Sequence, residues 1–166
     1  MLIAVLIAIY IALVFGLSRL IIPYMRSGAA GLPEVLPDSL ASAIQTLTHQ
    51  VKTKEEFLAL TYNYIGAKYR SERFNTVFKF SYLFLPLEKV WEMSGYMPCT
   101  QTNFLLSIFL VKSGFFKEEE IKKSHVPVNF VPHQYLIVRL DDKWVSVDVG
   151  EKQRGMPIGK HLKYFG

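Results

Sequence analysis

Three residues in the second half of the chain have the side chains that cysteine-nucleophile enzymes combine: Cys99, His133 and Asp148. A thiolate attacks a carbonyl carbon, an imidazole accepts and returns the proton, and a carboxylate orients the imidazole. Each residue alone has an ordinary structural explanation, because cysteine is a small buried hydrophobe and histidine and aspartate occur in and after strands. The set of three nevertheless suits acyl transfer, provided that the fold brings the side chains together.

The sequence around Cys99 predicts a buried helix that begins at Cys99 or one residue later. Pro98 suits a helix start because it has no N–H to leave unpaired, and Gly114 suits the helix end. Apolar residues fall on nearly every side of the helix between them: Phe104, Leu105, Ile108, Phe109 and Leu110. A thiol in the first turn lies near unpaired N–H groups and the positive end of the helix dipole. These groups favour a thiolate and offer donors to an oxyanion.

The segment from His133 to Gly150 predicts a hairpin of two antiparallel strands, because two runs rich in Val, Ile, Leu and Tyr are separated by Asp141-Asp142. If these two residues form a two-residue turn, Leu140 pairs with Lys143. His133 and Asp148 are then diagonal neighbours on one face of the hairpin. A three-residue turn would put them on opposite faces, so the prediction depends on turn length.

Together these features resemble the transglutaminase-like superfamily, a papain-like fold with a Cys, His, Asp triad. The resemblance covers about residues 55 to 160, and its most specific part is the segment Trp144 to Asp148 (WVSVD). It implies an α+β fold in which a helix with Cys99 at its N-terminus packs on an antiparallel sheet. It also implies Cys99, His133 and Asp148 as catalytic residues, and no cofactor.

The resemblance further implies an oxyanion site upstream of the nucleophile. Leu87 to Tyr96 (LEKVWEMSGY) predicts a short helix that ends at Gly95. Similar enzymes use a polar side chain from this region, together with the backbone N–H of the nucleophile, to hold the oxyanion. Trp91 and Tyr96 are the candidates for that side chain, and core packing is the alternative for both.

Residues 1–24 predict a transmembrane anchor that precedes the folded domain. Leu2 to Leu17 is uncharged, and a helix from Leu2 to Ile22 would extend for about 30 Å, the thickness of a bilayer core. A cleaved signal peptide is the alternative, although no Lys or Arg precedes the apolar run. Arg19 and Arg26 follow the span, so the positive-inside rule favours a cytoplasmic domain. The single cysteine is compatible with either side.

Residues 25–37 predict a linker rich in small residues and proline, and residues 38–166 predict one domain. Asp38 is expected to begin a helix, and Thr53 to Glu56 forms a capping box for a second helix that reaches Lys68. Lys117 to Lys123 is expected as a solvated helical turn. Tyr69 to Phe84 is expected as half-buried extended segments. With 51% hydrophobic residues, disorder is not expected.

Two other classes of function are weighed against the triad. A metal site would use Cys99, His133 and Asp148 with His125, but no paired spacing such as C-x-x-C is present. Nucleic-acid binding would use the basic and aromatic residues of 69–84 and the net charge of +5, but no known motif accompanies them. The charge also suits anionic lipid or an anionic wall polymer.

The predicted function is acyl transfer or hydrolysis at an amide bond by a membrane-anchored, transglutaminase-like cysteine protease, amidase or acyltransferase. Expected partners are a protein, peptide or cell-wall amide substrate and the membrane lipid around residues 1–24. Hydrolysis is favoured over transamidation, since nothing in the sequence resembles an amine-binding site. The alternative is a catalytically inactive, membrane-anchored binding module. The binding-module alternative stays open because the chain departs from the family at two positions. Pro98 occupies a position that is usually glycine in the family, and Val149 occupies one that is commonly proline.

Overall fold

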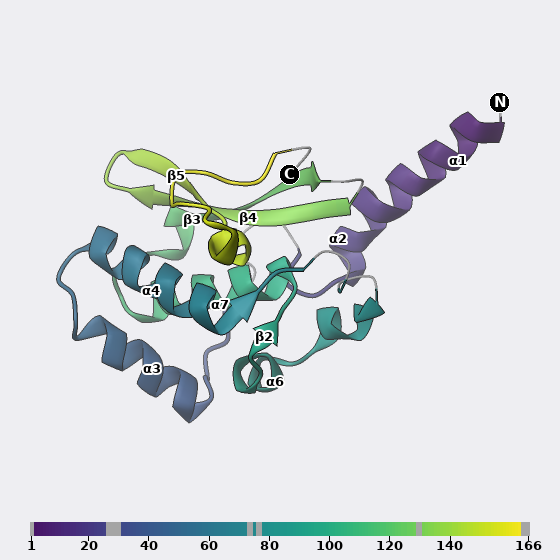
Figure 1. The fold of residues 1–166 in the computed structure, drawn as a ribbon. Coiled ribbons are helices and arrows are strands. Elements are labelled where there is room, and N and C mark those ends of the chain that lie inside the picture. The colour runs from purple at the N-terminus through teal and green to yellow at the C-terminus, as the bar shows by residue number, and fades with distance from the viewer. Residues whose placement is uncertain (1, 26–30, 73–74, 76–77, 129–130, 164–166) are drawn as a thin grey trace.

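A three-stranded antiparallel sheet forms one layer of the domain, and helices cover one of its faces (Figure 1). The computed structural model describes residues 2–25, 31–72, 75, 78–128 and 131–163. Strands β3 (Ile121–Val128), β4 (Val131–Leu140) and β5 (Lys143–Val147) follow one another in the chain and in the sheet, with β4 in the centre. The predicted α+β class is therefore confirmed.

The hairpin between β4 and β5 has the two-residue turn that the sequence predicts. Leu140 pairs with Lys143 and Leu136 with Val147. Asp141 adopts a φ of 50°, in the left-handed region that aspartate tolerates better than most residues. The register prediction is therefore confirmed, and it puts His133 and the residue after β5, Asp148, on the same face.

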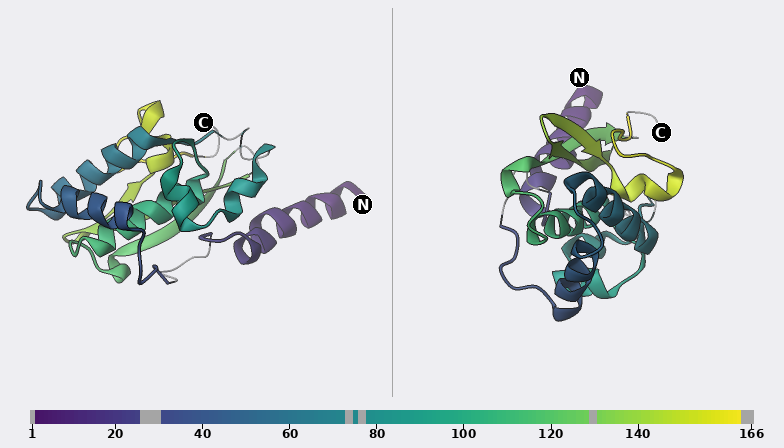
Figure 2. Two further views of the ribbon diagram at one scale, coloured as in Figure 1. Left: turned by 90° about the horizontal axis from the view of Figure 1, so that it is seen from below. Right: turned by 90° about the vertical axis from the view of Figure 1, so that its left-hand side faces the viewer.

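The helices lie mainly on one face of the sheet, as the two rotated views in Figure 2 also show. Helix α7 (Cys99–Lys112) contacts β4, and α4 (Lys54–Lys68) packs beside α7. Helices α3 (Asp38–Thr48) and α6 (Leu87–Glu92) lie farther from the sheet. The capping box before α4 is confirmed: Thr53 Oγ1 accepts from Glu56 N at 3.2 Å, and Glu56 Oε2 accepts from Thr53 N at 3.2 Å.

Helix α7 forms the centre of the core. Every residue from 100 to 110 is buried, since the sheet, α4 and the 3-10 helix η4 (Val149–Arg154) contact it from different sides. A helix surrounded in this way has apolar residues all round, which is the pattern that the sequence shows. Polar residues in this stretch are buried too, and two of them, Gln101 and Asn103, donate to backbone carbonyls outside the helix.

Two expectations for the charged and aromatic segments are wrong. Only Glu118–Glu120 (η3) is helical in the segment 117–123, because the lysines that follow belong to the edge strand β3, where lysine is well tolerated. Among the described residues of the segment 69–84, only Tyr69–Arg70 (β1) forms a strand. It pairs in parallel with Gly95–Tyr96 (β2). Phe80–Phe84 forms a 3-10 helix (η2), with Phe80 exposed and Leu83 buried.

The N-terminal residues form a helical arm that projects from the domain (Figure 1). It comprises α1 (Leu2–Ile11), the π-helical segment η1 (Ala12–Leu17) and α2 (Ser18–Ile21). Within the described ranges, no helix combines the length and the apolar character needed to cross a membrane. Residues 26–30 of the expected linker lie outside the described residues, and the domain's first helix begins at Asp38 as expected.

Tyr24 fixes the base of the arm to the domain. Its backbone adopts a φ of 66°, a strained conformation for an aromatic residue, so the surrounding contacts must hold it there. Its ring stacks on Phe104 of α7 with centroids 3.9 Å apart, and its carbonyl accepts from Gln134 Nε2 at 3.2 Å. The next residue, Met25, is buried. The arm is therefore tied to α7 and β4, the two elements that contribute Cys99 and His133.

Candidate active site

Cys99 is the first residue of α7, as the sequence predicts. Pro98 precedes it in an extended conformation, and the Pro98 carbonyl accepts from the N–H groups of Gln101 and Thr102, at 3.1 Å each. The side chain of Cys99 is partly exposed, although the residues that follow it in α7 are buried. The thiol therefore meets both the N-terminal end of a buried helix and accessible space, two conditions that a nucleophile requires.

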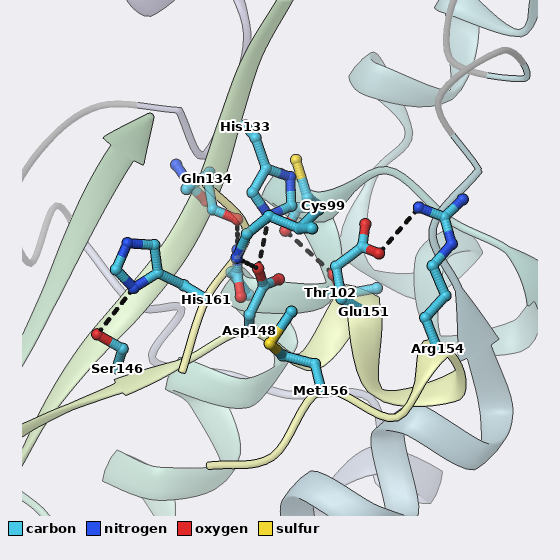
Figure 3. Close-up of polar contacts among 12 residues, drawn as sticks. Cys99, Thr102, His133, Gln134, Ser146, Asp148, Glu151, Arg154, Met156 and His161 are labelled. Atoms are coloured by element: carbon cyan, nitrogen blue, oxygen red, sulfur yellow. Dashed lines mark hydrogen bonds and ion pairs between the residues drawn. The ribbon is translucent and has the colours of Figure 1, made fainter. Parts of the chain in front are cut away.

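His133 lies between Asp148 and Cys99 (Figure 3). Its Nε2 is 2.8 Å from Asp148 Oδ2, and Cys99 is close enough to act on the charge of the ring. Since Nε2 is engaged by the carboxylate, Nδ1 is the ring nitrogen left for the thiol. Both His133 and Asp148 are buried, so little water screens this contact. The structure thus brings the three predicted residues together in the order that a triad requires.

The surroundings of His133 favour its protonated form. Burial lowers the pKa of the imidazole, but the hydrogen bonds and charges of Asp148 and Cys99 outweigh burial and raise that pKa to about 10. A protonated imidazole beside a thiol stabilises the thiolate. The site therefore favours a protonated His133 at neutral pH.

A buried hydrogen bond holds α7 and β4 in register beside the triad. Asn103, one helical turn after Cys99, donates from Nδ2 to the carbonyl of Gln134, the neighbour of His133, at 2.7 Å. Gln134 in turn contacts Tyr24 and, through Nε2, lies 3.1 Å from His125 Nε2. His125 therefore lies close to the site but is engaged by Gln134. These contacts set the distance between the nucleophile and its base.

The C-terminal segment positions the carboxylate of Asp148. The Leu162 N–H donates to Oδ2 at 3.1 Å, so this oxygen receives two donors. Tyr62 of α4 donates to the backbone carbonyls of Met156 and, at 3.5 Å, of Asp148 itself. The sequence reasoning missed Leu162 and Tyr62 because their contacts join distant segments, and no local motif marks them.

His161 is a second histidine near the triad that the sequence reasoning also missed. Its Nδ1 is 3.2 Å from Ser146 Oγ, and its ring stacks on Tyr135 with centroids 4.0 Å apart. Burial lowers the pKa of His161, as do Lys163 and His133, while Asp148 opposes them. The ring therefore favours its neutral form, and it packs against the hairpin through Tyr135 and Ser146.

The two oxyanion candidates lie in different surroundings. Trp91 is buried in the core and its only donor, Nε1, bonds with Ser39 Oγ at 2.9 Å, which leaves no donor for an oxyanion. Tyr96 is buried in β2, and its ring lies 5.8 Å from that of Tyr82. Its role remains a prediction. The backbone N–H of Cys99 belongs to the first turn of α7, where N–H groups have no partner within the helix.

No protein-family model, curated protein or solved structure matches this chain. A function can therefore be proposed for this chain only from its residues and their geometry. Among the described residues, no three His, Cys, Asp or Glu side chains are grouped so that they could hold a metal ion.

A cavity of about 440 Å³ opens beside the triad, within the usual size range of small-molecule sites. Cys99 and His133 both line it, so a molecule bound there would meet the thiol. Residues of the N-terminal arm form another part of the wall. The cavity is therefore shared between the domain and the arm, an arrangement that the sequence reasoning did not predict.

Proposed function

We propose that this protein is a cysteine-nucleophile enzyme that cleaves amide bonds by acyl transfer, with water as the final acceptor. One observation carries the proposal: His133 hydrogen bonds with Asp148 and lies beside Cys99, and Cys99 begins a helix at a cavity that both Cys99 and His133 line. Side chains from α7, from β4 and from the residue after β5 meet in the order nucleophile, base and orienting acid. A cysteine with a purely structural role would not require a buried histidine–aspartate pair beside it.

The proposed reaction has two steps. The Cys99 thiolate forms a C–S bond with the amide carbonyl, the C–N bond breaks, and the leaving amine takes a proton from His133. Water then attacks the thioester and gives a proton to His133, and the C–S bond breaks to release a carboxylic acid. The Cys99 backbone N–H stabilises the oxyanion in both steps. Asp148 keeps the imidazole oriented throughout.

We also propose that the domain belongs with the transglutaminase-like enzymes and that the arm anchors it in a membrane. The first proposal is supported by the sequential order of Cys99, His133 and Asp148 and by the contact between α7 and the antiparallel sheet. The second is supported by the many apolar side chains that the arm exposes, among them Leu2, Ile3, Leu6 and Ile9.

The direct test is a search for an acyl-enzyme. The full chain is incubated with a panel of N-acyl and N-blocked peptide p-nitroanilides, while release of p-nitroaniline and the mass of the protein are followed. We expect an acyl adduct on Cys99, and in Cys99→Ala a loss of turnover on the order of 10³-fold or more, with an unchanged circular dichroism spectrum.

A primary amine added to the same assay separates hydrolysis from transamidation. We expect the carboxylic acid to remain the main product when cadaverine is present. Equal turnover by the wild-type protein and Cys99→Ala, or the absence of any adduct across the panel, would contradict the enzyme proposal and favour the binding module.

A further inference from the structure

The wall of the cavity beside Cys99 is almost entirely hydrocarbon. Aliphatic side chains come from the arm (Leu13, Leu17 and Ile21), from η2 (Leu83) and from the ends of β3 and β4 (Val128 and Val131). Among the described residues that line it, none is Asp, Glu, Lys or Arg. The polar side chains in the wall are three hydroxyls (Ser18, Ser71 and Thr100), the Cys99 thiol and the His133 imidazole. Such a wall favours an uncharged, apolar occupant.

The cavity has a defined wall, because the arm that completes it is fixed to the domain. Tyr24, at the base of the arm, stacks on Phe104 and accepts a hydrogen bond from Gln134. Met25, which follows, is buried and itself lines the cavity. The aliphatic side chains of the arm are therefore held opposite the triad.

A hydrocarbon chain fits this wall better than a peptide does. A buried peptide segment carries one N–H and one C=O per residue, and each needs a hydrogen-bond partner. The wall offers few such partners, whereas each methylene of an aliphatic chain is stabilised by leaving water. Leu13 and Leu17 are also partly exposed on the arm, so the cavity wall continues into an apolar surface. If lipid surrounded the arm, a hydrocarbon chain could pass from the lipid along this surface into the cavity.

Taking the proposed function as its basis, we propose that the substrate is an amide whose acyl part is an aliphatic chain, which lies in this cavity with its carbonyl carbon at Cys99. The Cys99 sulfur bonds to that carbon as the C–N bond breaks, and the amine leaves with the proton from His133. Water then replaces sulfur, and the products are a long-chain carboxylic acid and the regenerated thiolate. The substrate is thus an N-acyl lipid or a lipid-modified amine.

The test measures kcat/KM of the full chain, in phosphatidylcholine nanodiscs, for N-acyl p-nitroanilides from acetyl to dodecanoyl, each below its aggregation concentration. We expect kcat/KM to rise by about fourfold per methylene until the chain fills the cavity, and then to level off. The position of the plateau reports the length of the cavity.

A cavity-filling variant and a matched control identify where the chain binds. Leu17→Trp adds bulk to the wall at a side chain that is 41% exposed, so the fold should tolerate it. We expect its plateau to move to chains several carbons shorter. Leu20→Trp alters the same arm at a side chain that is 67% exposed and is not part of this wall, and its profile should match that of the wild-type protein.

The possible results separate this inference from the proposed function. Equal kcat/KM for acetyl and decanoyl substrates, with an adduct on Cys99, would overturn the aliphatic substrate and leave the acyl-transfer mechanism standing. A chain-length profile that Leu17→Trp does not change would overturn the assignment of the chain to this cavity. If no acyl or peptide substrate modifies Cys99, the mechanism and the inference both fail.

Discussion

At the scale of single residues, His133 is the group on which the site depends. It is buried, yet its contacts with Asp148 and Cys99 raise its pKa to about 10. A buried imidazole without these partners would favour its neutral form. The charge on His133 therefore depends on its two neighbours, and a change in either neighbour should be measurable at the imidazole.

Asp148→Asn should lower the pKa of His133, because it removes a negative charge while keeping the shape of the side chain. Titration of the imidazole nitrogens by NMR measures this directly. Acylation of Cys99 should slow by on the order of 10³-fold to 10⁴-fold, as when the acid of a Ser-His-Asp triad is replaced. Asp142→Asn, at the exposed turn of the same hairpin, is the control and should change neither quantity. An unchanged His133 pKa in Asp148→Asn would show that the carboxylate does not act on the ring.

The raised pKa of His133 also predicts how stability depends on pH. Below about pH 6.5 the imidazole is protonated in both the folded and the unfolded chain, so its stabilising contribution is fully present. As pH rises from there through the folded pKa of about 10, the folded state loses that proton and the contribution disappears. Urea unfolding should therefore show that the stability difference between the wild-type protein and His133→Gln shrinks from about pH 7 to about pH 10. A difference that grows would contradict the assignment.

At the scale of elements, the site depends on how α7 meets β4. Cys99 and His133 belong to different elements, and the buried bond from Asn103 to the Gln134 carbonyl fixes their relative position. Without this bond α7 could slide along the strand, since most of its other contacts are apolar and have no direction.

Asn103→Ala should therefore both destabilise the fold and slow the chemistry. Loss of the donor leaves a buried carbonyl without its partner and should lower the free energy of unfolding by about 1–3 kcal/mol. Alkylation of Cys99 should slow as well, since the distance from the thiol to His133 is no longer fixed. Ser107→Ala, one turn further along α7, removes a buried hydroxyl that bonds only within the helix, and should leave alkylation unchanged. Equal alkylation by the two variants would contradict this role of Asn103.

Elements with strong local signals were predicted correctly from the sequence. The capping box before α4, the Pro98 start of α7 and the Asp141-Asp142 turn each depend on residues within a few positions of one another. Because the turn has two residues, the register of the hairpin followed directly. The segment 69–84 was predicted poorly, since its alternation of charged and aromatic residues suits an exposed 3-10 turn as well as a strand.

At the scale of the whole molecule, the arm and the domain together enclose the site. Contacts between residues far apart in sequence build this arrangement: Tyr24 with Phe104, Tyr62 with Met156, and Leu162 with Asp148. No pattern in the sequence encodes such pairs, so the triad could be predicted but its supports and the cavity could not. The outer part of the arm exposes apolar side chains, among them Leu6 and Ile9, and these bear on membrane binding.

A charge in the exposed part of the arm should weaken binding to membranes. Ile9→Lys puts a cation at an exposed position of α1, and a charged residue at the centre of a membrane helix costs about 2.5–3.5 kcal/mol. The fraction of protein that floats with phosphatidylcholine vesicles should fall strongly. Thr46→Lys adds the same charge at an exposed position of α3 and should float like the wild-type protein. Equal flotation of both variants would contradict the anchor.

The most direct test of the central claim is the pH dependence of Cys99 alkylation in the full chain, compared with His133→Ala. Cys99 is the only cysteine, so iodoacetamide reports on this thiol alone. We predict that the wild-type rate stays high well below pH 7, whereas the variant follows an ordinary thiol, which titrates near pH 8.5. Identical profiles that both follow an ordinary thiol would mean that Cys99 is structural, and the binding module would then replace the enzyme.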